Sequence, residues 1–287
     1  MGYTKHIMDI PQLQYEPLVR AALAEDIGPG DITSTLCIPE GTQATATVLA
    51  KQPGVIAGLA IGALAFHLLD PEAVWTPSVK DGDAVGEGRT PLAAVTGDAR
   101  ALLTAERVAL NFMQRLSGVA TVTARYVAAV SGTSARIVDT RKTTPGQRML
   151  EKYAVRMGGG FNHRIGLYDC VLIKDNHIKA AGGIGPAVAR AKANVPHTMK
   201  VEVEASTPAH VAEALAAGAD IILLDNMDTD TMRWAVETIG ERAISEASGG
   251  LTESRVAEVA ATGVNILSVG ALTHSAPALD ISLDFGD

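Results

Sequence analysis

The second half of the chain alternates short apolar runs with longer amphipathic stretches. Runs with the length and composition typical of strands occur six times. They are residues 135–141, 169–175, 200–205, 220–226, 243–249 and 265–272. Amphipathic stretches, which predict helices, lie between them at 148–159, 185–195, 207–218, 228–240 and 252–263. This alternation predicts parallel strands joined by crossover helices.

The stretch 207–218 carries the clearest helix signals. Thr207 suits the N-cap, Pro208 suits the first helical position and Gly218 suits the end. A doubly wound sheet is a second arrangement of such units, but no GxGxxG motif follows the first strand. We therefore expect an α/β fold of the TIM-like barrel type. Six strands are fewer than the eight of a full barrel, so we expect the barrel to be open and incomplete.

The first part of the chain mixes helical and strand-like stretches without this regular alternation. Ala44, Ala46 and Val48 alternate with threonines, which predicts a strand, and residues 79–116 read as turn, strand, turn and long helix. We expect an α+β domain at residues 1–115, with the C-terminal tail 276–287 packing back on it. The barrel domain is then expected at residues 116–275.

Composition narrows the partners of this protein. Of its 287 residues 47% are hydrophobic, which is typical of a globular protein with a buried core. The formal net charge of -8 argues against nucleic acid as a binding partner. Segment 136–179 nevertheless holds nine Lys and Arg residues against four Asp and Glu residues, which favours a small anionic ligand. The apolar stretch 54–69 is too short for a confident membrane span, and the N-terminal stretch lacks the apolar run of a secretory signal. Cys37 and Cys170 show no metal-binding spacing. We expect a cytoplasmic protein with no membrane partner.

Each predicted strand ends in polar residues or glycine, at the position where βα barrels place their chemistry. In chain order these residues are Arg141 and Lys142, then Lys174, Glu204 and Asp225, then Ser248, Gly249 and Gly250, and finally Gly270 and His274. Random surface polarity would not select the same end of six strands. The pattern therefore predicts one mouth that binds anionic ligands.

The residue types at this mouth leave several kinds of chemistry open. Glu204 and Asp225 offer the oxygen ligands that Mg²⁺ prefers, although both could instead pair with nearby lysines. The glycine-rich turns suit a phosphate group, yet glycine after a strand is often a simple turn. Arg141 and Arg164 suit carboxylates, which their planar groups bind in bidentate fashion. Lys174 at a strand end is also the arrangement of Schiff-base aldolases.

Eight segments of the chain strongly resemble the quinolinate phosphoribosyltransferase family, the carboxylating nicotinate-nucleotide pyrophosphorylases. They are AEDIGPGDIT, AERVALNFMQRLSGVAT, DTRKTTPGQRMLEKYAV, GGGFNHRIGLYDCVLIKDNHI, VEVE, LLDN, EASGG and SVGALTHS. The resemblance implies an N-terminal sandwich domain and an open α/β barrel, assembled as a homodimer. It also implies that quinolinate and phosphoribosyl pyrophosphate react, with Mg²⁺, to nicotinate mononucleotide, pyrophosphate and CO₂ in NAD biosynthesis.

The resemblance carries the family's site residues onto positions of this chain. Those implied for quinolinate are Thr140, Arg141, His163 and Arg164, together with Arg107 reaching across the dimer interface. Those implied for phosphoribosyl pyrophosphate are Lys142, Lys174, Glu204, Asp225, Ser248, Gly249, Gly250, Gly270 and His274. The catalytic residues among them are Lys142, Lys174, Glu204 and Asp225, and the last two would hold Mg²⁺ directly or through water. The rival hypotheses are a Schiff-base aldolase, a phosphoribosyltransferase for nicotinate, and a non-catalytic anion-binding paralogue.

Overall fold

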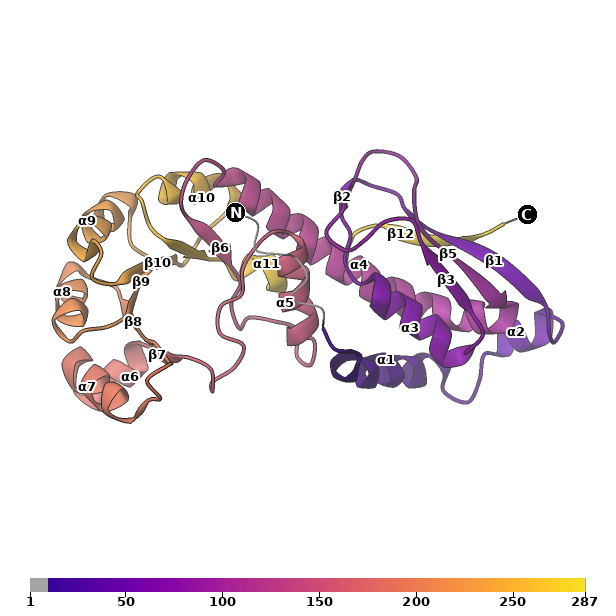
Figure 1. The fold of residues 1–287 in the computed structure, drawn as a ribbon, viewed down its shortest axis with the longest axis horizontal. Coiled ribbons are helices and arrows are strands. Elements are labelled where there is room, and N and C mark those ends of the chain that lie inside the picture. Colours follow the sequence, from indigo (N-terminus) through magenta and orange to yellow (C-terminus); the bar gives the residue numbers. More distant parts are fainter. Residues whose placement is uncertain (1–9, 287) are drawn as a thin grey trace. The chain divides into compact units, whose positions relative to one another are not determined.

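The computed structural model describes residues 10–286, which divide into two compact units (Figure 1). The first unit contains the chain up to Ala124, Thr144–Gly159 and the chain from Ser275 onward. The second contains Arg125–Thr143 and Gly160–His274. The expectation of no secretory signal concerns residues 1–9 above all, and these lie outside the described part of the chain.

The first unit is built on a four-stranded antiparallel sheet. Its strands, in spatial order, are β12 (Ile281–Phe285), β1 (Gln43–Ala50), β5 (Thr90–Asp98) and β3 (Val74–Pro77). Two further short strands, β2 (Gly54–Val55) and β4 (Ala84–Val85), form a separate antiparallel pair. The helices are α1 (Gln12–Ile27), α2 (Ile32–Cys37), α3 (Leu59–Leu69), α4 (Ala99–Ala129) and α5 (Arg148–Met157). The α+β character expected from the first part of the chain is therefore present.

Close packing joins these helices to the sheet. The ring of Phe66 on α3 stacks on Trp75 of β3 with centroids 5.8 Å apart. At Gly62 of α3 a Cβ atom would lie 2.6 Å from the sulfur of Met113 on α4, so any larger residue would require the Met113 side chain to move.

The end of the chain belongs to the first unit. Strand β12 pairs antiparallel with β1, with Ala50 opposite Ile281. Just before it, a Cβ atom added to Gly118 of α4 would lie 1.9 Å from the carbonyl oxygen of Pro277. Helix α4 therefore has a glycine where the returning chain crosses it.

The second unit is a six-stranded parallel sheet, as the alternating pattern predicts. Its strands, in spatial order, are β6 (Arg136–Val138), β11 (Ile266–Ser268), β10 (Ile244–Ser248), β9 (Ile221–Asp225), β8 (Val201–Ala205) and β7 (Val171–Ile173). Its helices are α6 (Asp175–Ala181), α7 (Ile184–Asn194), α8 (Pro208–Ala216), α9 (Thr229–Ile239), α10 (Glu253–Ala260) and α11 (Ala271–His274). In Figure 1 helices α7 to α10 follow the outer side of a curved row of strands.

Alternate residues of each strand face these helices or the inner side of the curve. On β8, Val201, Val203 and Ala205 are almost fully buried, as expected of the face that packs on helices. The intervening residues, Glu202 and Glu204, face the other way, and the register aligns Glu204 with Leu223 and Glu246. The inner face of the sheet therefore carries carboxylates.

The local signals of the predicted helix 207–218 are confirmed. The side chain of Thr207 caps α8 by accepting a hydrogen bond from His210 N–H at 3.2 Å, and Pro208 opens the helix. Gly218 follows with φ of +77°, a left-handed conformation that suits glycine.

The expected boundary near residue 115 falls within helix α4, and the two compact units divide the same helix after Ala124. Helix α4 runs without a break through that point to Ala129, because nothing in its sequence interrupts the helical pattern. Helix α5 was expected as a crossover helix of the barrel, but its residues group with the first unit. Accordingly, β6 and β7 are not neighbours, and they form the two ends of the six-stranded sheet. Within residues 10–286 no helix combines the length and apolarity needed to cross a membrane.

A buried carboxylate ties α5 into the first unit. Glu151 is fully buried and accepts hydrogen bonds from Arg115 Nη2 at 2.6 Å and from Thr144 Oγ1 at 2.7 Å. Replacing it by alanine leaves Arg115 without this partner. We expect Glu151→Ala to lower the free energy of unfolding by about 3 kcal/mol.

Urea unfolding followed by Trp75 fluorescence, in a Trp234→Phe background, measures this change within the first unit. Glu16→Gln is the matched control, because Glu16 forms an exposed pair with Arg20 and its loss should leave the midpoint nearly unchanged. Equal midpoints for the two variants would contradict the prediction.

Candidate active site

The parallel register brings the predicted strand-end residues to one edge of the sheet. Asp225 ends β9 and lies opposite Ser248, which ends β10, and Ser248 lies opposite Ser268 of β11. On the other side, Ile173 of β7 pairs with Val203, so Lys174 follows its strand beside Glu204. All strands run in the same direction, so these residues share the carboxyl edge of the sheet.

Two acidic residues and a lysine interact at this edge. Burial raises the pKa of Glu204, the negative charge of Asp225 raises it further, and the positive charge of Lys174 lowers it. Two half-buried carboxylates that repel one another are a suitable donor set for a divalent cation, since oxygen ligands of this kind are those that Mg²⁺ takes.

Lys142, Gly270 and His274 also lie together. A Cβ atom added to Gly270 would be 3.0 Å from Cδ of Lys142 and 3.2 Å from the imidazole of His274. The hydroxyl of Thr273 donates a hydrogen bond to the carbonyl oxygen of Lys142 at 2.8 Å. The loop after β6 and the short helix α11 after β11 are therefore joined at the same edge.

The turn after β10 requires its two glycines. Gly249 and Gly250 have φ angles of +91° and +57°. A side chain at Gly249 would also collide with Asn226, whose atoms would lie 2.1 Å from its Cβ. Asn226 itself has φ of +54° and donates its amide N–H to Asp225 Oδ2 at 3.0 Å. The two turns after β9 and β10 thus pack on one another.

The segment Gly160–Arg164 is held against β6. Phe161 forms a single parallel bridge with Val138, and its N–H donates to the carbonyl of Ile137 at 2.8 Å. The buried carboxylate of Asp139 then accepts hydrogen bonds from His163 N–H at 2.9 Å and from the Asn162 side chain at 2.6 Å. Thr140 and Arg141 directly follow Asp139, so both arms of the predicted carboxylate site are fixed to one strand end.

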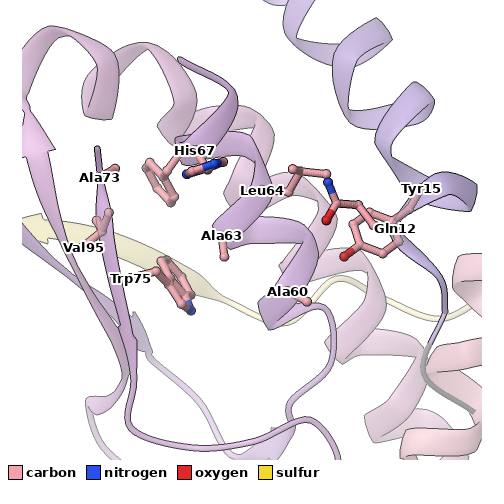
Figure 2. Close-up of a pocket in the computed structure, with 10 residues that line it drawn as sticks. Gln12, Tyr15, Ala60, Ala63, Leu64, His67, Ala73, Trp75 and Val95 are labelled. Atoms are coloured by element: carbon pink, nitrogen blue, oxygen red, sulfur yellow. The ribbon is translucent and has the colours of Figure 1, made fainter. Parts of the chain in front are cut away.

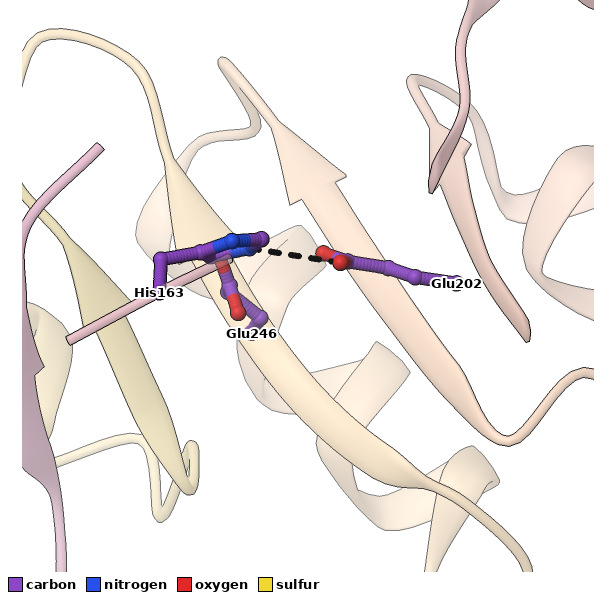
Figure 3. Close-up of side chains that lie close together, drawn as sticks. All are labelled: His163, Glu202 and Glu246. Carbon is purple, nitrogen blue, oxygen red and sulfur yellow. Dashed lines mark ion pairs between the residues drawn. The ribbon is translucent and has the colours of Figure 1, made fainter. Parts of the chain in front are cut away.

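His163 meets two buried carboxylates on the inner face of the sheet (Figure 3). Its Nε2 lies 3.2 Å from Glu202 of β8 and 3.4 Å from Glu246 of β10. Burial lowers the pKa of this imidazole, but the hydrogen bonds and charges of the two carboxylates outweigh burial and raise the pKa to about 10. Burial likewise raises the pKa of Glu202.

The position of the proton follows from the second ring nitrogen. Nδ1 of His163 accepts a hydrogen bond from Arg164 N–H at 2.7 Å, which requires an Nδ1 without a proton. The ring itself is therefore neutral, with its proton on Nε2. The extra proton that the raised pKa values of His163 and Glu202 indicate is held by the two carboxylates beside it. The same three side chains offer ligand atoms within 4.8 Å of one another, so they also form a possible metal-binding group.

Two cavities lie in different parts of the molecule. In the second unit a cavity of about 560 Å³ is lined by Arg164, Cys170 and His177, together with apolar residues. In the first unit a cavity of about 400 Å³ lies between α1, α3 and the sheet, lined by Tyr15 and Trp75 among others (Figure 2). No residue of the predicted site lines the latter. Arg107 is an exposed residue of α4 in the first unit.

Four residues with a clear place at this edge or directly beneath it were not singled out from the sequence: Asp139, Glu202, Asn226 and Glu246. Glu202 stands between two valines of its strand, and an acidic residue at an inward position of such a strand is the signal that could have identified it. Glu246 stands between Ser245 and Ala247, so its strand gives a weaker signal. Asn226 follows a strand directly, where asparagine tolerates a left-handed conformation.

The fold and this edge define an α/β protein whose parallel sheet gathers cationic side chains, carboxylates and glycine turns at its carboxyl ends. Family models named for the N-terminal and C-terminal domains of quinolinate phosphoribosyl transferase match residues 31–117 and 119–284. The chain belongs to the quinolinate phosphoribosyltransferase family. The resemblance seen in the sequence motifs is thereby confirmed.

Individual relatives agree with this assignment. The chain is 47% identical over 272 residues to a Bacillus subtilis (strain 168) protein named "Probable nicotinate-nucleotide pyrophosphorylase [carboxylating]", covering 95% of this chain and 93% of that protein. It is 44% identical to the nicotinate-nucleotide pyrophosphorylase [carboxylating] of Mycobacterium leprae (strain TN), covering 93% and 95% of the two chains. The solved structure of the nicotinate-nucleotide pyrophosphorylase from Francisella tularensis superimposes with a TM-score of 0.93 at 40% identity, covering 99% of this chain and 100% of that one. The Schiff-base aldolase hypothesis has no support among these relatives.

The two cysteines should differ in reactivity because of the charges at this site. Burial raises the pKa of the Cys170 thiol to about 11, and the nearby carboxylate of Glu202 adds to the effect. Since the thiolate is the reactive form, a pKa about two units above the ordinary value should slow alkylation about 100-fold at pH 7.5. Cys37 is exposed and should react readily.

Peptide mass spectrometry over a time course with iodoacetamide measures both rates in one sample. The variants Cys37→Ser and Cys170→Ser, each with a single thiol, serve as controls. Comparable rates for the two thiols would be inconsistent with a half-buried Cys170 beside carboxylates.

Proposed function

We propose that this chain transfers the phosphoribosyl group of phosphoribosyl pyrophosphate to quinolinate and releases CO₂. The products are nicotinate mononucleotide, pyrophosphate and CO₂, and the reaction serves NAD biosynthesis. The observation that carries this proposal is the carboxyl edge of the parallel sheet, where cations follow β6 and β7, carboxylates end β8 and β9, and glycine turns follow β10 and β11. The names of relatives such as that of Mycobacterium leprae support it.

Quinolinate carries two carboxylates, which suits the cationic side of this edge. Thr140, Arg141, His163 and Arg164 bind them in this proposal, through charge-assisted hydrogen bonds. Arg107 lies in the first unit, and we assign it to the site of a partner subunit in a homodimer. A dicarboxylate accounts for several cationic groups better than nicotinate, which has one carboxylate.

Phosphoribosyl pyrophosphate occupies the remaining positions of the edge. Backbone N–H groups of the turns suit its 5′-phosphate, because such turns point donors at an anion. The residues assigned to this group are Ser248, Gly249, Gly250, Gly270 and His274. Lys142 and Lys174 lie between the two substrates and neutralise the pyrophosphate. Lys142 beside Gly270 and His274 supports this arrangement.

Glu204 and Asp225 hold the ribose hydroxyls and Mg²⁺, directly or through water. Their mutual repulsion, which raises the pKa of Glu204, is relieved by a bound cation. When bound, Mg²⁺ neutralises charge on the pyrophosphate group.

The mechanism follows from the charges at the edge. The pyridine nitrogen of quinolinate attacks the anomeric carbon as the bond to pyrophosphate breaks, and the two lysines stabilise charge on the leaving oxygens. Glu204 and Asp225 stabilise the positive sugar ring. The nitrogen is then a pyridinium cation, and its positive charge stabilises the electron pair that stays on the neighbouring carbon when CO₂ departs. Phosphoribosyl transfer therefore precedes decarboxylation, and the carbon takes up a proton last.

We also propose the finer features of the fold that suit this function. The sheet is an open form of the TIM-like barrel, with its gap between β6 and β7, and the N-terminal part is a sandwich domain. We retain the catalytic domain at 116–275, the N-terminal domain at 1–115 and a cytoplasmic location as predictions. The alternative is a non-catalytic paralogue that binds an anion. Such a protein would form no product from quinolinate and phosphoribosyl pyrophosphate.

The purified protein should convert quinolinate and phosphoribosyl pyrophosphate in the presence of Mg²⁺. We expect CO₂ from carboxyl-labelled quinolinate and nicotinate mononucleotide in a 1:1 ratio, with the activity lost on chelation by EDTA and restored by Mg²⁺. Nicotinate in place of quinolinate is the control substrate and should give less than about 1% of the rate. No product, or equal rates for the two acids, would refute the proposed function.

Lys142→Ala should reduce kcat about 100-fold while the KM for quinolinate stays within about threefold. A lysine that acts mainly on charge developing at the leaving group contributes to the transition state more than to substrate binding. Lys179→Ala, which removes an exposed lysine paired with Asp175, is the control and should leave both constants unchanged. An unchanged kcat for Lys142→Ala would argue against its assigned role.

A site shared between subunits predicts complementation. Arg107→Ala and Arg141→Ala should each raise the KM for quinolinate at least tenfold, because a charge-assisted hydrogen bond contributes about 2 kcal/mol. Dimers mixed from the two variants regain one intact site, so random mixing should restore about a quarter of wild-type activity. The absence of rescue in mixed dimers verified by native mass spectrometry would exclude sharing of Arg107.

A further inference from the structure

Two glutamates that no substrate needs to touch lie beneath the candidate site. Glu202 of β8 has an exposed fraction of 0% and Glu246 of β10 one of 2%, while the His163 side chain above them is 13% exposed. Both carboxylates converge on a single atom, Nε2 of His163, at 3.2 and 3.4 Å (Figure 3). A buried carboxylate costs several kcal/mol unless it is paired, so this convergence is a substantial constraint on the ring.

The other side of the same ring holds the backbone of the proposed quinolinate site. Nδ1 of His163 accepts the N–H of Arg164 at 2.7 Å, and the guanidinium of Arg164 donates to the carbonyl of Cys170 at 3.1 Å. The N–H of His163 is fixed by the buried carboxylate of Asp139. The imidazole therefore connects two central strands of the sheet to a segment that otherwise depends on β6.

We propose that Glu202 and Glu246 are positioning residues for quinolinate: they accept the Nε2–H of His163, and the ring so oriented fixes the backbone of Arg164. This rests on the proposed function and extends it to two residues inside the sheet. Hydrogen-bond partners behind a functional ring commonly fix its tautomer and direction in this way. The glutamates act through His163 and do not touch the substrate.

The geometry favours this role over a metal site made by the same three side chains. Nε2 of His163 lies within ion-pair distance of both carboxylates, at 3.2 and 3.4 Å. The same two carboxylate oxygens have no hydrogen-bond partner among the described residues, so His163 is the group that offsets their burial. The positive charge of Arg164 already acts on Glu202, which disfavours a second cation beside it. Charged groups beside the cluster are Arg164 and Asp169, which act on the Cys170 thiol together with Glu202, and Asp139, whose carboxylate accepts the peptide N–H of His163.

Paired substitutions separate hydrogen bonding from charge. The double variant Glu202→Met with Glu246→Met removes both acceptors, and we expect it to raise the KM for quinolinate at least tenfold. The KM for phosphoribosyl pyrophosphate should change less than about twofold. Glu202→Gln with Glu246→Gln keeps acceptor oxygens of the same shape and should rescue the KM for quinolinate to within about threefold. Glu237→Met, which alters an exposed carboxylate of the same unit, is the matched control.

Two kinetic outcomes would overturn the proposal. If the glutamine pair is impaired as strongly as the methionine pair, the charge of the carboxylates matters and the orientation of the ring does not. If the methionine pair raises both KM values equally, the glutamates support the fold in general. Circular dichroism and thermal unfolding of each variant identify those that fail to fold.

Nuclear magnetic resonance of the wild-type protein tests the same idea without substitution or turnover. In ¹⁵N-histidine-labelled protein at pH 7.5, with His163 assigned through His163→Gln, we expect the neutral tautomer with a proton on Nε2 and none on Nδ1. A proton on Nδ1 would overturn the proposal, as would loss of the Nε2 proton on adding Zn²⁺ or Mg²⁺, which would identify a metal site. If this tautomer is found but quinolinate is not turned over, the proposed function is wrong, whereas the orientation of the His163 ring by the two glutamates is still supported.

Discussion

The in-register pairing of six parallel strands is the constraint on which the rest of this molecule depends. Parallel strands present their carboxyl ends at one edge, so any residue that ends a strand is delivered to a common place. Asp225, Ser248 and Ser268 lie side by side for this reason alone. The turns that follow can then specialise, as Asn226 and Gly249 do by packing on one another.

The place where the sheet does not close is equally informative. The first strand, β6, pairs with the last one, β11, and not with the next in the chain, β7. The chain between β6 and β7 contains α5, which groups with the other unit, so no crossover helix seats β7 beside β6. Gly160–Arg164 pairs briefly with the free edge of β6 instead, and this brings His163 and Arg164 to the carboxyl edge.

Buried carboxylates connect the interior of the sheet to that edge. Glu202 and Glu246 occupy inward positions where apolar residues would be less costly, and burial shifts the pKa of Glu202 upward accordingly. Both are directed at His163, so the energy of burying them is linked to the position of one ring.

Much of this could be predicted from the sequence, because hydrophobic periodicity and helix capping are local properties. The six strands, the helix capped by Thr207 and the polar character of each strand end are all set by neighbouring residues in the chain, and the family motifs are continuous segments. The short helix α6 was missed, since its seven residues carry no buried apolar face. What only the tertiary structure decided is non-local: the order of strands, the membership of α5, and the meeting of His163 with Glu202 and Glu246. Those contacts join residues far apart in the chain through backbone pairing and burial, which no single segment encodes.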